Sequence, residues 1–112
     1  MKIYISGMIT SLKEEQYRKA FNKAANHLTK LGHEPVDPSL LGKPEHHAWD
    51  YYMRKAIVQL VECDAIYMLS SYNVSKGALL EKKIAEALGM TVWIEQTVNE
   101  DLDTGNYGQE EI

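Results

Sequence analysis

A single carboxylate, Glu81, lies within the apolar arc of the last helix that the sequence predicts. On a helical wheel of about 100° per residue, that arc also holds Gly77, Ala78, Leu80, Ile84, Ala85, Ala87 and Leu88, whereas Lys82, Lys83 and Glu86 share the other arc. A carboxylate removed from water is unstable in its ionised form unless it is paired or neutralised. Glu81 is therefore either a structural carboxylate paired with a Lys or Arg, or a group that performs chemistry.

Small polar residues follow two predicted strands at their carboxyl ends. One loop is Ser6-Gly7-Met8-Ile9-Thr10, and the other runs from Ser70 through Ser75 and Gly77 toward Glu81. Loops at the carboxyl ends of neighbouring parallel strands face one crevice, where open α/β sheets bind ligands. Glycine permits a close backbone approach, and free amides and hydroxyls suit a phosphate or a sugar hydroxyl. We expect ligand contacts from both loops, although Ser6 and Gly7 also fit a simple turn and Ser75 fits a helix cap. The predicted ligand-binding residues in these loops are Ser6, Gly7, Met8, Ser75 and Gly77.

The elements that position these loops alternate between strand and helix. Strands are predicted at 2–5, 33–36, 65–69 and 91–94, and helices at 13–31, from 48 or 49 to 61, and around Glu81 to Leu88, with Gly32 and Gly89 as C-cap residues. This order predicts a small three-layer α/β domain of the Rossmann-like or flavodoxin-like type, with a parallel sheet of four or five strands. The second helix is expected to bury Trp49, Tyr52, Met53, Ala56, Ile57, Leu60 and Val61, or to use its aromatic residues against a nucleobase or another subunit. Residues 1–95 are expected to form the domain, and the acidic residues 96–112 are expected to form a loose tail or an arm that docks elsewhere.

Composition narrows the classes of function. A chain of 112 residues with 45% hydrophobic residues supports one core. A net charge of −4 with dispersed basic residues argues against a nucleic-acid partner. The single cysteine, Cys63, is expected to be a buried thiol. The absence of an apolar leader or of a membrane span predicts a cytoplasmic protein without membrane contact. The first loop lacks the dinucleotide and Walker patterns, and His46-His47 lacks chelating spacing, so no cofactor and no metal are expected.

Four segments together resemble the nucleoside 2-deoxyribosyltransferase-like superfamily. They are residues 2–7, residues 50–54, residues 63–69, and Ser75-Lys76-Gly77 with Glu81. The nearest resemblance is to a short branch of uncharacterised proteins that is common in bacteriophages and prophages, which would place the protein in the host cytoplasm. The resemblance implies a homo-oligomer in which Glu81 attacks the anomeric carbon of a nucleoside or nucleotide while Tyr4 orients Glu81. A carboxylate suits this role because it stabilises the oxocarbenium-like transition state.

One position departs from the family pattern. Family enzymes carry an aspartate in the second helix, just after a Met-Arg pair, and Ala56 occupies that position here. The candidates to replace this aspartate are Asp50, Asp37 and Glu62. We include Asp50 among the predicted ligand-binding residues. Loss of a general acid lowers a rate by about 10²–10⁴-fold. The chain is therefore expected to cleave or transfer at an N-glycosidic bond, or to be a non-catalytic phage sponge that sequesters a nucleotide immune signal such as an NAD-derived cyclic nucleotide. A third alternative is an assembly protein with a vestigial pocket.

Overall fold

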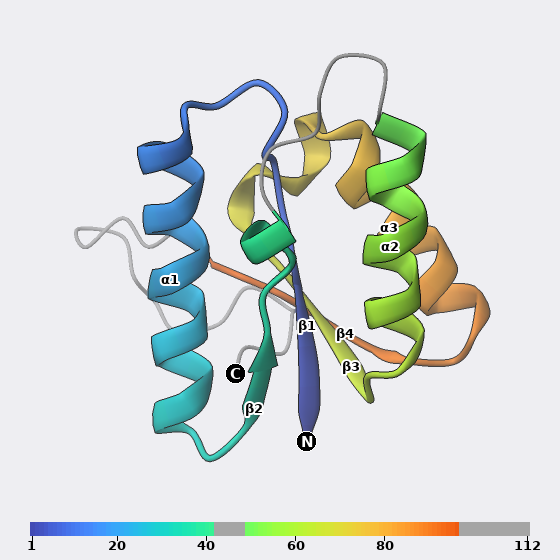
Figure 1. The fold of residues 1–112 in the computed structure, drawn as a ribbon. Helices are drawn as coiled ribbons and strands as arrows, with labels where there is room; N and C mark the ends of the chain where they lie inside the picture. Colours follow the sequence, from blue (N-terminus) through green and yellow to red (C-terminus); the bar gives the residue numbers. More distant parts are fainter. Residues whose placement is uncertain (42–48, 97–112) are drawn as a thin grey trace.

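The protein has a three-layer α/β fold. The computed structural model describes residues 1–41 and 49–96. A four-stranded parallel sheet lies between α1 on one face and α2 and α3 on the other (Figure 1). The elements are β1 (Lys2–Ser6), α1 (Glu14–Lys30), β2 (Glu34–Val36), α2 (Trp49–Val61), β3 (Ala65–Met68), α3 (Lys76–Ala87) and β4 (Thr91–Ile94). This confirms the predicted fold class. Within the described ranges, no helix has the length and apolar character needed to cross a bilayer.

The strand order places a crevice next to the end of β1. The order is β2-β1-β3-β4, so β1 and β3 are the two central strands. The chain leaves β1 toward β2 on one side and later returns to β3 on the other side, which makes the gap between β1 and β3 the switch point of the sheet. Ser6 pairs with Met68 in the parallel register, and the Leu69 amide donates to the Ser6 carbonyl at 2.7 Å. The loops that follow Ser6 and Met68 therefore start side by side.

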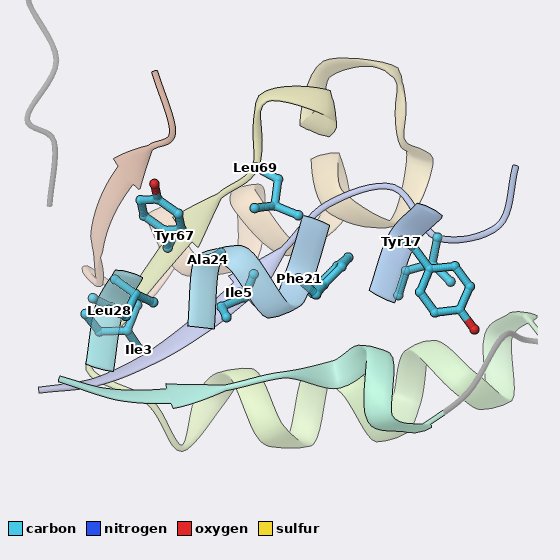
Figure 2. Packing of buried hydrophobic residues seen from close by; sticks show 10 residues of the cluster. Ile3, Ile5, Tyr17, Phe21, Ala24, Leu28, Tyr67 and Leu69 are labelled. Carbon is cyan, nitrogen blue, oxygen red and sulfur yellow. The ribbon is translucent and has the colours of Figure 1, made fainter. Parts of the chain in front are cut away.

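Alternation along β1 divides its side chains between the two faces of the sheet. Ile3 and Ile5 pack with Phe21 and Leu28 of α1 in one buried cluster, which Figure 2 shows at close range. Tyr4 lies on the opposite face, in the cluster that includes residues of α2 and α3. Because side chains alternate along a strand, Ser6 points to the same face as Tyr4. Both hydroxyl groups are thus directed toward α3.

Helix α3 buries a narrower stripe than the wheel predicts. Its buried residues are Ala78, Glu81 and Ala85, so the prediction that Glu81 lies in the buried face is confirmed. Leu80 and Leu88 were expected on that face, but they are 36% and 59% exposed, and Ala87 is exposed as well. On the wheel, Leu80 and Ala87 lie about 130° and 150° from the centre of the buried stripe. Leu88 is the C-cap residue, beyond the last turn that packs on the sheet.

Helix α2 is buried through Met53, Ala56 and Leu60. Val61 was expected to face the core, but it is 48% exposed because it follows the last buried turn of the helix. At the other end of α2, Trp49 and Tyr52 are half-buried. The amino-terminal turns of this helix therefore leave two aromatic side chains partly accessible at the edge of the sheet where the crevice lies.

The ends of the helices follow the expected cap chemistry. The C-cap residues are Leu31 and Leu88, so Gly32 and Gly89 lie one position later than predicted. Both glycines have positive φ angles, 87° and 73°, which L-residues with a side chain rarely adopt. The Ser75 hydroxyl accepts a hydrogen bond from the Ala78 amide at 3.1 Å and so caps α3. The segment before this cap was predicted as a loop, but it contains a short 3-10 helix, Ser70–Val74. That compact turn keeps the start of α3 close to the end of β3.

Candidate active site

A pocket of about 400 Å³ opens at the carboxyl ends of β1 and β3. Its volume lies within the range of small-molecule sites. It contains Glu81 together with both predicted loops, so the expected convergence of these segments is confirmed. The lining residues come from β1 and the loop after it, the segment after β2, the beginning of α2, the segment before α3 and α3 itself, with one residue from α1. They are Tyr4, Gly7, Met8, Ile9, Thr10, Ser11, Phe21, Pro38, Trp49, Tyr52, Met53, Val74, Ser75, Lys76, Gly77, Ala78 and Glu81.

The Glu81 carboxylate is held by two hydroxyl groups from β1. Tyr4 Oη donates to Glu81 Oε2 at 2.5 Å, and Ser6 Oγ donates to Glu81 Oε1 at 2.6 Å. The residue is 5% exposed. The ion pairs recorded among residues 1–41 and 49–96 are Arg18–Asp37 and Lys82–Glu86, and neither includes Glu81. A carboxylate that uses neutral donors in place of a cation keeps its charge available to a ligand.

Burial gives Glu81 unusual acid–base behaviour. Loss of hydration raises the pKa of its carboxyl group from 4.5 to about 7, although the hydrogen bonds from Ser6 and Tyr4 lower it in part. Burial and the nearby Glu81 charge raise the pKa of Tyr4, so its phenol remains a donor. Near neutral pH, Glu81 is therefore present in both protonation states. It can act as a nucleophile or base when ionised and as an acid when protonated.

Two glycines shape the approach to Glu81. A Cβ atom at Gly7 would lie 2.6 Å from Leu69 Cδ1, so the loop after β1 packs directly against that side chain. A Cβ atom at Gly77 would lie 3.1 Å from Met53 Sδ and 3.9 Å from Trp49 Nε1. Any larger residue at either position would displace a neighbouring side chain.

Lys76 brings a positive charge to the pocket. Its ammonium group lies 4.2 Å from the centroid of the Trp49 ring, which is a cation–π arrangement. Both side chains line the pocket. Among the lining residues that the structure describes, Lys76 carries the positive charge and Glu81 the negative one. The mixed apolar and charged lining resembles that of sites that orient a polar ligand by a few groups.

A hydrogen-bonded wall closes the side of the pocket next to β2. Tyr52 Oη donates to the Pro38 carbonyl at 3.2 Å, which ties α2 to the segment after β2. Arg18 of α1 contacts the same segment, with its Nη1 at 3.3 Å from Asp37 Oδ2 and 2.5 Å from Ser39 Oγ. The Ser39 amide donates to Asp37 Oδ1 at 2.9 Å. Both oxygens of Asp37 are therefore occupied by protein donors.

The structure separates the candidates for the second carboxylate from the pocket. Asp50 is exposed in the first turn of α2 and does not line the pocket, and Asp37 is not a lining residue either. Glu62 is exposed directly after the end of α2. Ala56 is fully buried in the cluster that contains Tyr4. Glu81 is thus the only acid among the described lining residues.

Other predicted positions differ in where they lie. Gly7, Met8, Ser75 and Gly77 line the pocket, whereas Ser6 is fully buried and contacts it through Glu81. Tyr52 was predicted only for the core or for base stacking. Its spacing from Trp49 and Met53, at i, i+3 and i+4, is the sequence feature that places these three lining residues on one face of α2. No cluster of three or more potential metal ligands is found in the described ranges, and His46-His47 lies outside them. Residues 97–112 also lie outside the described ranges.

The fold is similar to two solved enzyme structures. One is a 2-deoxyribosyltransferase from the psychrotolerant bacterium Bacillus psychrosaccharolyticus, with a TM-score of 0.64 and 21% identity over 88% of this chain and 77% of that chain. The other is the Clostridium botulinum CMP N-glycosidase BcmB, with a TM-score of 0.54 and 18% identity over 93% of this chain and 75% of that chain. No curated protein matches the sequence significantly. The sequence matches one family over residues 1–94, and the chain therefore belongs to the family described as domain of unknown function DUF4406.

Proposed function

We propose that the chain binds a nucleoside or nucleotide in the Glu81 pocket and cleaves or transfers at its N-glycosidic bond, with Glu81 as the nucleophile. The observation that carries this proposal is the buried Glu81 carboxylate, fixed by Tyr4 and Ser6 in a pocket of about 400 Å³. Two proteins of the same fold are a 2-deoxyribosyltransferase and a CMP N-glycosidase, which supports this class of reaction.

The chemistry follows from the position of the carboxylate. One Glu81 oxygen forms a bond to the anomeric carbon while the bond from that carbon to the base nitrogen breaks, and the bonding electron pair stays with the base. The base leaves after it takes up a proton. Water or a second base then attacks the glycosyl ester and releases Glu81 as a carboxylate. The transition state carries positive charge on the sugar, which an ionised Glu81 stabilises at short range.

Tyr4 and Ser6 are proposed to orient the nucleophile. Each hydroxyl donates to a different oxygen of Glu81, so the plane of the carboxylate is fixed. Met8, Gly7, Ser75 and Gly77 remain the proposed contacts to sugar or phosphate because they line the same pocket. Asp50 is a weaker proposal, since it is exposed outside the pocket.

The test is incubation of the protein with nucleosides, deoxynucleoside monophosphates and cyclic nucleotides, followed by mass spectrometry of free and protein-retained species. Release of base by the wild-type protein, with none from Glu81→Gln, is the expected result. The matched control is Glu86→Gln, which changes an exposed carboxylate on the same helix. Equal base release by wild type and Glu81→Gln would contradict the proposed role of Glu81.

A second candidate function is binding without turnover. It is favoured by Ala56, which stands where nucleoside 2-deoxyribosyltransferase-like enzymes have an aspartate. It is also favoured by the absence of a second carboxylate among the described lining residues. In this function the protein is a phage-encoded sponge that retains a nucleotide immune signal unchanged in the host cytoplasm. Retention of an intact ligand by the wild-type protein would support it. Gain of base release by Ala56→Asp would then show that the missing carboxylate is what prevents turnover.

We further propose that the protein is a homo-oligomer that associates through α2. This helix exposes three apolar or aromatic side chains, Tyr51, Val58 and Val61, which are 61%, 57% and 48% exposed. Exposed apolar residues that gather on one helix suit a self-complementary interface. Light scattering should show a monomer for Val58→Glu and a larger species for the wild type. Truncation after Gln96 tests whether the acidic tail docks on another subunit. If it does, the truncated protein should lose assembly or ligand affinity.

A further inference from the structure

The proposed reaction needs a proton donor for the leaving base, and the described lining residues include no second carboxylate to provide it. Among the described lining residues, the O–H groups belong to Tyr4, Thr10, Ser11, Tyr52 and Ser75. The Tyr4 hydroxyl already donates a hydrogen bond to Glu81. Lys76 also lines the pocket, but its ammonium group lies over the Trp49 ring. Among the remaining hydroxyl groups a phenol is a stronger acid than serine or threonine, which makes Tyr52 the candidate donor.

Tyr52 has the position that this role requires. It lies on α2 four residues before Ala56, so both residues share one face of the helix. Its ring packs against the buried clusters on both sides of the sheet. Its hydroxyl reaches the Pro38 carbonyl at 3.2 Å, and both residues line the pocket. The phenol is thus held in place at the pocket wall by a long hydrogen bond to a neutral acceptor, which a better acceptor can replace.

Resting on the proposed function, we propose that Tyr52 is the catalytic residue that donates a proton to the leaving base, in place of the carboxylate that is missing at Ala56. As the bond between the anomeric carbon and the base nitrogen breaks, the electron pair goes to the base, and the Tyr52 O–H proton moves to that base. The products of this step are the neutral base, the Tyr52 phenolate and the glycosyl ester of Glu81. When water attacks the ester, its proton returns to Tyr52 and the carboxylate of Glu81 is released.

The charge of Glu81 links the two groups. Burial, followed by the Glu81 charge, raises the pKa of Tyr52, which keeps the phenol protonated before the reaction. Formation of the glycosyl ester neutralises Glu81 and so removes one of these two causes. The pKa of Tyr52 therefore falls as the leaving base gains electrons. In the second step, release of the carboxylate restores the original charge and favours the reprotonated phenol.

The experiment compares two leaving groups in wild type and Tyr52→Phe. The substrates are the four deoxynucleoside monophosphates and 4-nitrophenyl 2-deoxyribofuranoside 5′-phosphate, whose nitrophenolate leaves without a proton. We expect Tyr52→Phe to lower kcat for base release by about 10²–10⁴-fold and to leave nitrophenolate release unchanged. Tyr51→Phe is the matched control, since its exposed neighbouring ring does not line the pocket. Phenylalanine retains the ring of Tyr52, and thermal unfolding checks that the variant is folded.

The other outcomes overturn the proposal. An equal loss for both substrates would mean that Tyr52 positions Glu81 or the sugar and is not the acid. Base release at the wild-type rate by Tyr52→Phe would mean that another group supplies the proton. The proposed function fails by a different result, in which Glu81→Gln releases nitrophenolate as fast as the wild type. Loss of nitrophenolate release in Glu81→Gln, together with an equal effect of Tyr52→Phe on both substrates, would overturn only the role of Tyr52.

Discussion

Replacement of Glu81 by glutamine should stabilise the protein more at alkaline than at acidic pH. The pKa of Glu81 rises from 4.5 to about 7 on folding, so the folded state binds this proton more strongly than the unfolded state. Ionised Glu81 therefore lowers the free energy of unfolding as pH rises from about 4.5 to about 7, and the loss remains above that pH. A shift of this size lowers the free energy of unfolding by about 1 kcal/mol at pH 5.5 and by about 3 kcal/mol at pH 8.5.

The measurement is urea unfolding of wild type and Glu81→Gln at these two pH values. Because glutamine does not ionise, the stability of Glu81→Gln minus that of wild type should increase by about 2 kcal/mol from pH 5.5 to pH 8.5. Changes in the hydrogen bonds to Tyr4 and Ser6 alter the absolute difference but are shared by both measurements. Glu86→Gln removes an exposed carboxylate that is paired with Lys82 at 2.8 Å, and should change stability by less than about 1 kcal/mol. A difference between wild type and Glu81→Gln that does not change with pH would refute the reasoning.

Three further predictions follow from single contacts. If the protein releases base, kcat/KM should rise with pH and level off above about 7, where Glu81 is ionised. Tyr4→Phe should move the midpoint of this pH profile upward, because the Tyr4 hydrogen bond lowers the pKa of Glu81. Gly7→Ala should lower the free energy of unfolding by about 1–3 kcal/mol in urea titrations because its Cβ would lie 2.6 Å from Leu69 Cδ1, and Leu69→Ala should recover part of this loss. Burial raises the pKa of the Cys63 thiol to about 11, so a thiol reagent should react with it only after unfolding.

Much of the fold could be predicted because its signals are local. The periodicity of α1, the glycines at the helix ends and the short apolar strands each depend on residues that are close in sequence, and all were placed within one or two residues. The solvent exposure of Leu80 and Val61 was not predicted. A helical wheel tells which residues share a face, but not how wide a stripe the neighbouring elements cover. That width depends on the tertiary packing of α2, α3 and the sheet.

The site was predictable only in part for the same reason. Alternating strands and helices predict a parallel sheet, in which the loops at the carboxyl ends of the strands lie along one edge. The strand order then places the loops after β1 and β3 side by side, next to Glu81. No local sequence pattern predicts the wall of the pocket next to β2. It depends on the hydrogen bond from Tyr52 to Pro38 and on contacts of Arg18 with Asp37, which join residues 14 and 19 positions apart on different elements. The choice of Asp37 as a spare acid overlooked Arg18, since nothing local shows that its oxygens are already occupied.

The cost of Glu81 to the fold and its proposed use have one physical origin. The apolar surroundings that raise its pKa also keep water from screening its charge, so the ionised carboxylate interacts strongly with any positive charge that develops beside it. Tyr4 and Ser6 moderate this cost without neutralising the group, because hydroxyl donors leave the net charge in place. A lysine in their position would make Glu81 a more stable ion pair and a weaker nucleophile. Such a site lowers the stability of the fold and raises the reactivity of the carboxylate. It is therefore expected where a bound ligand, and not another group of the protein, neutralises the charge of Glu81.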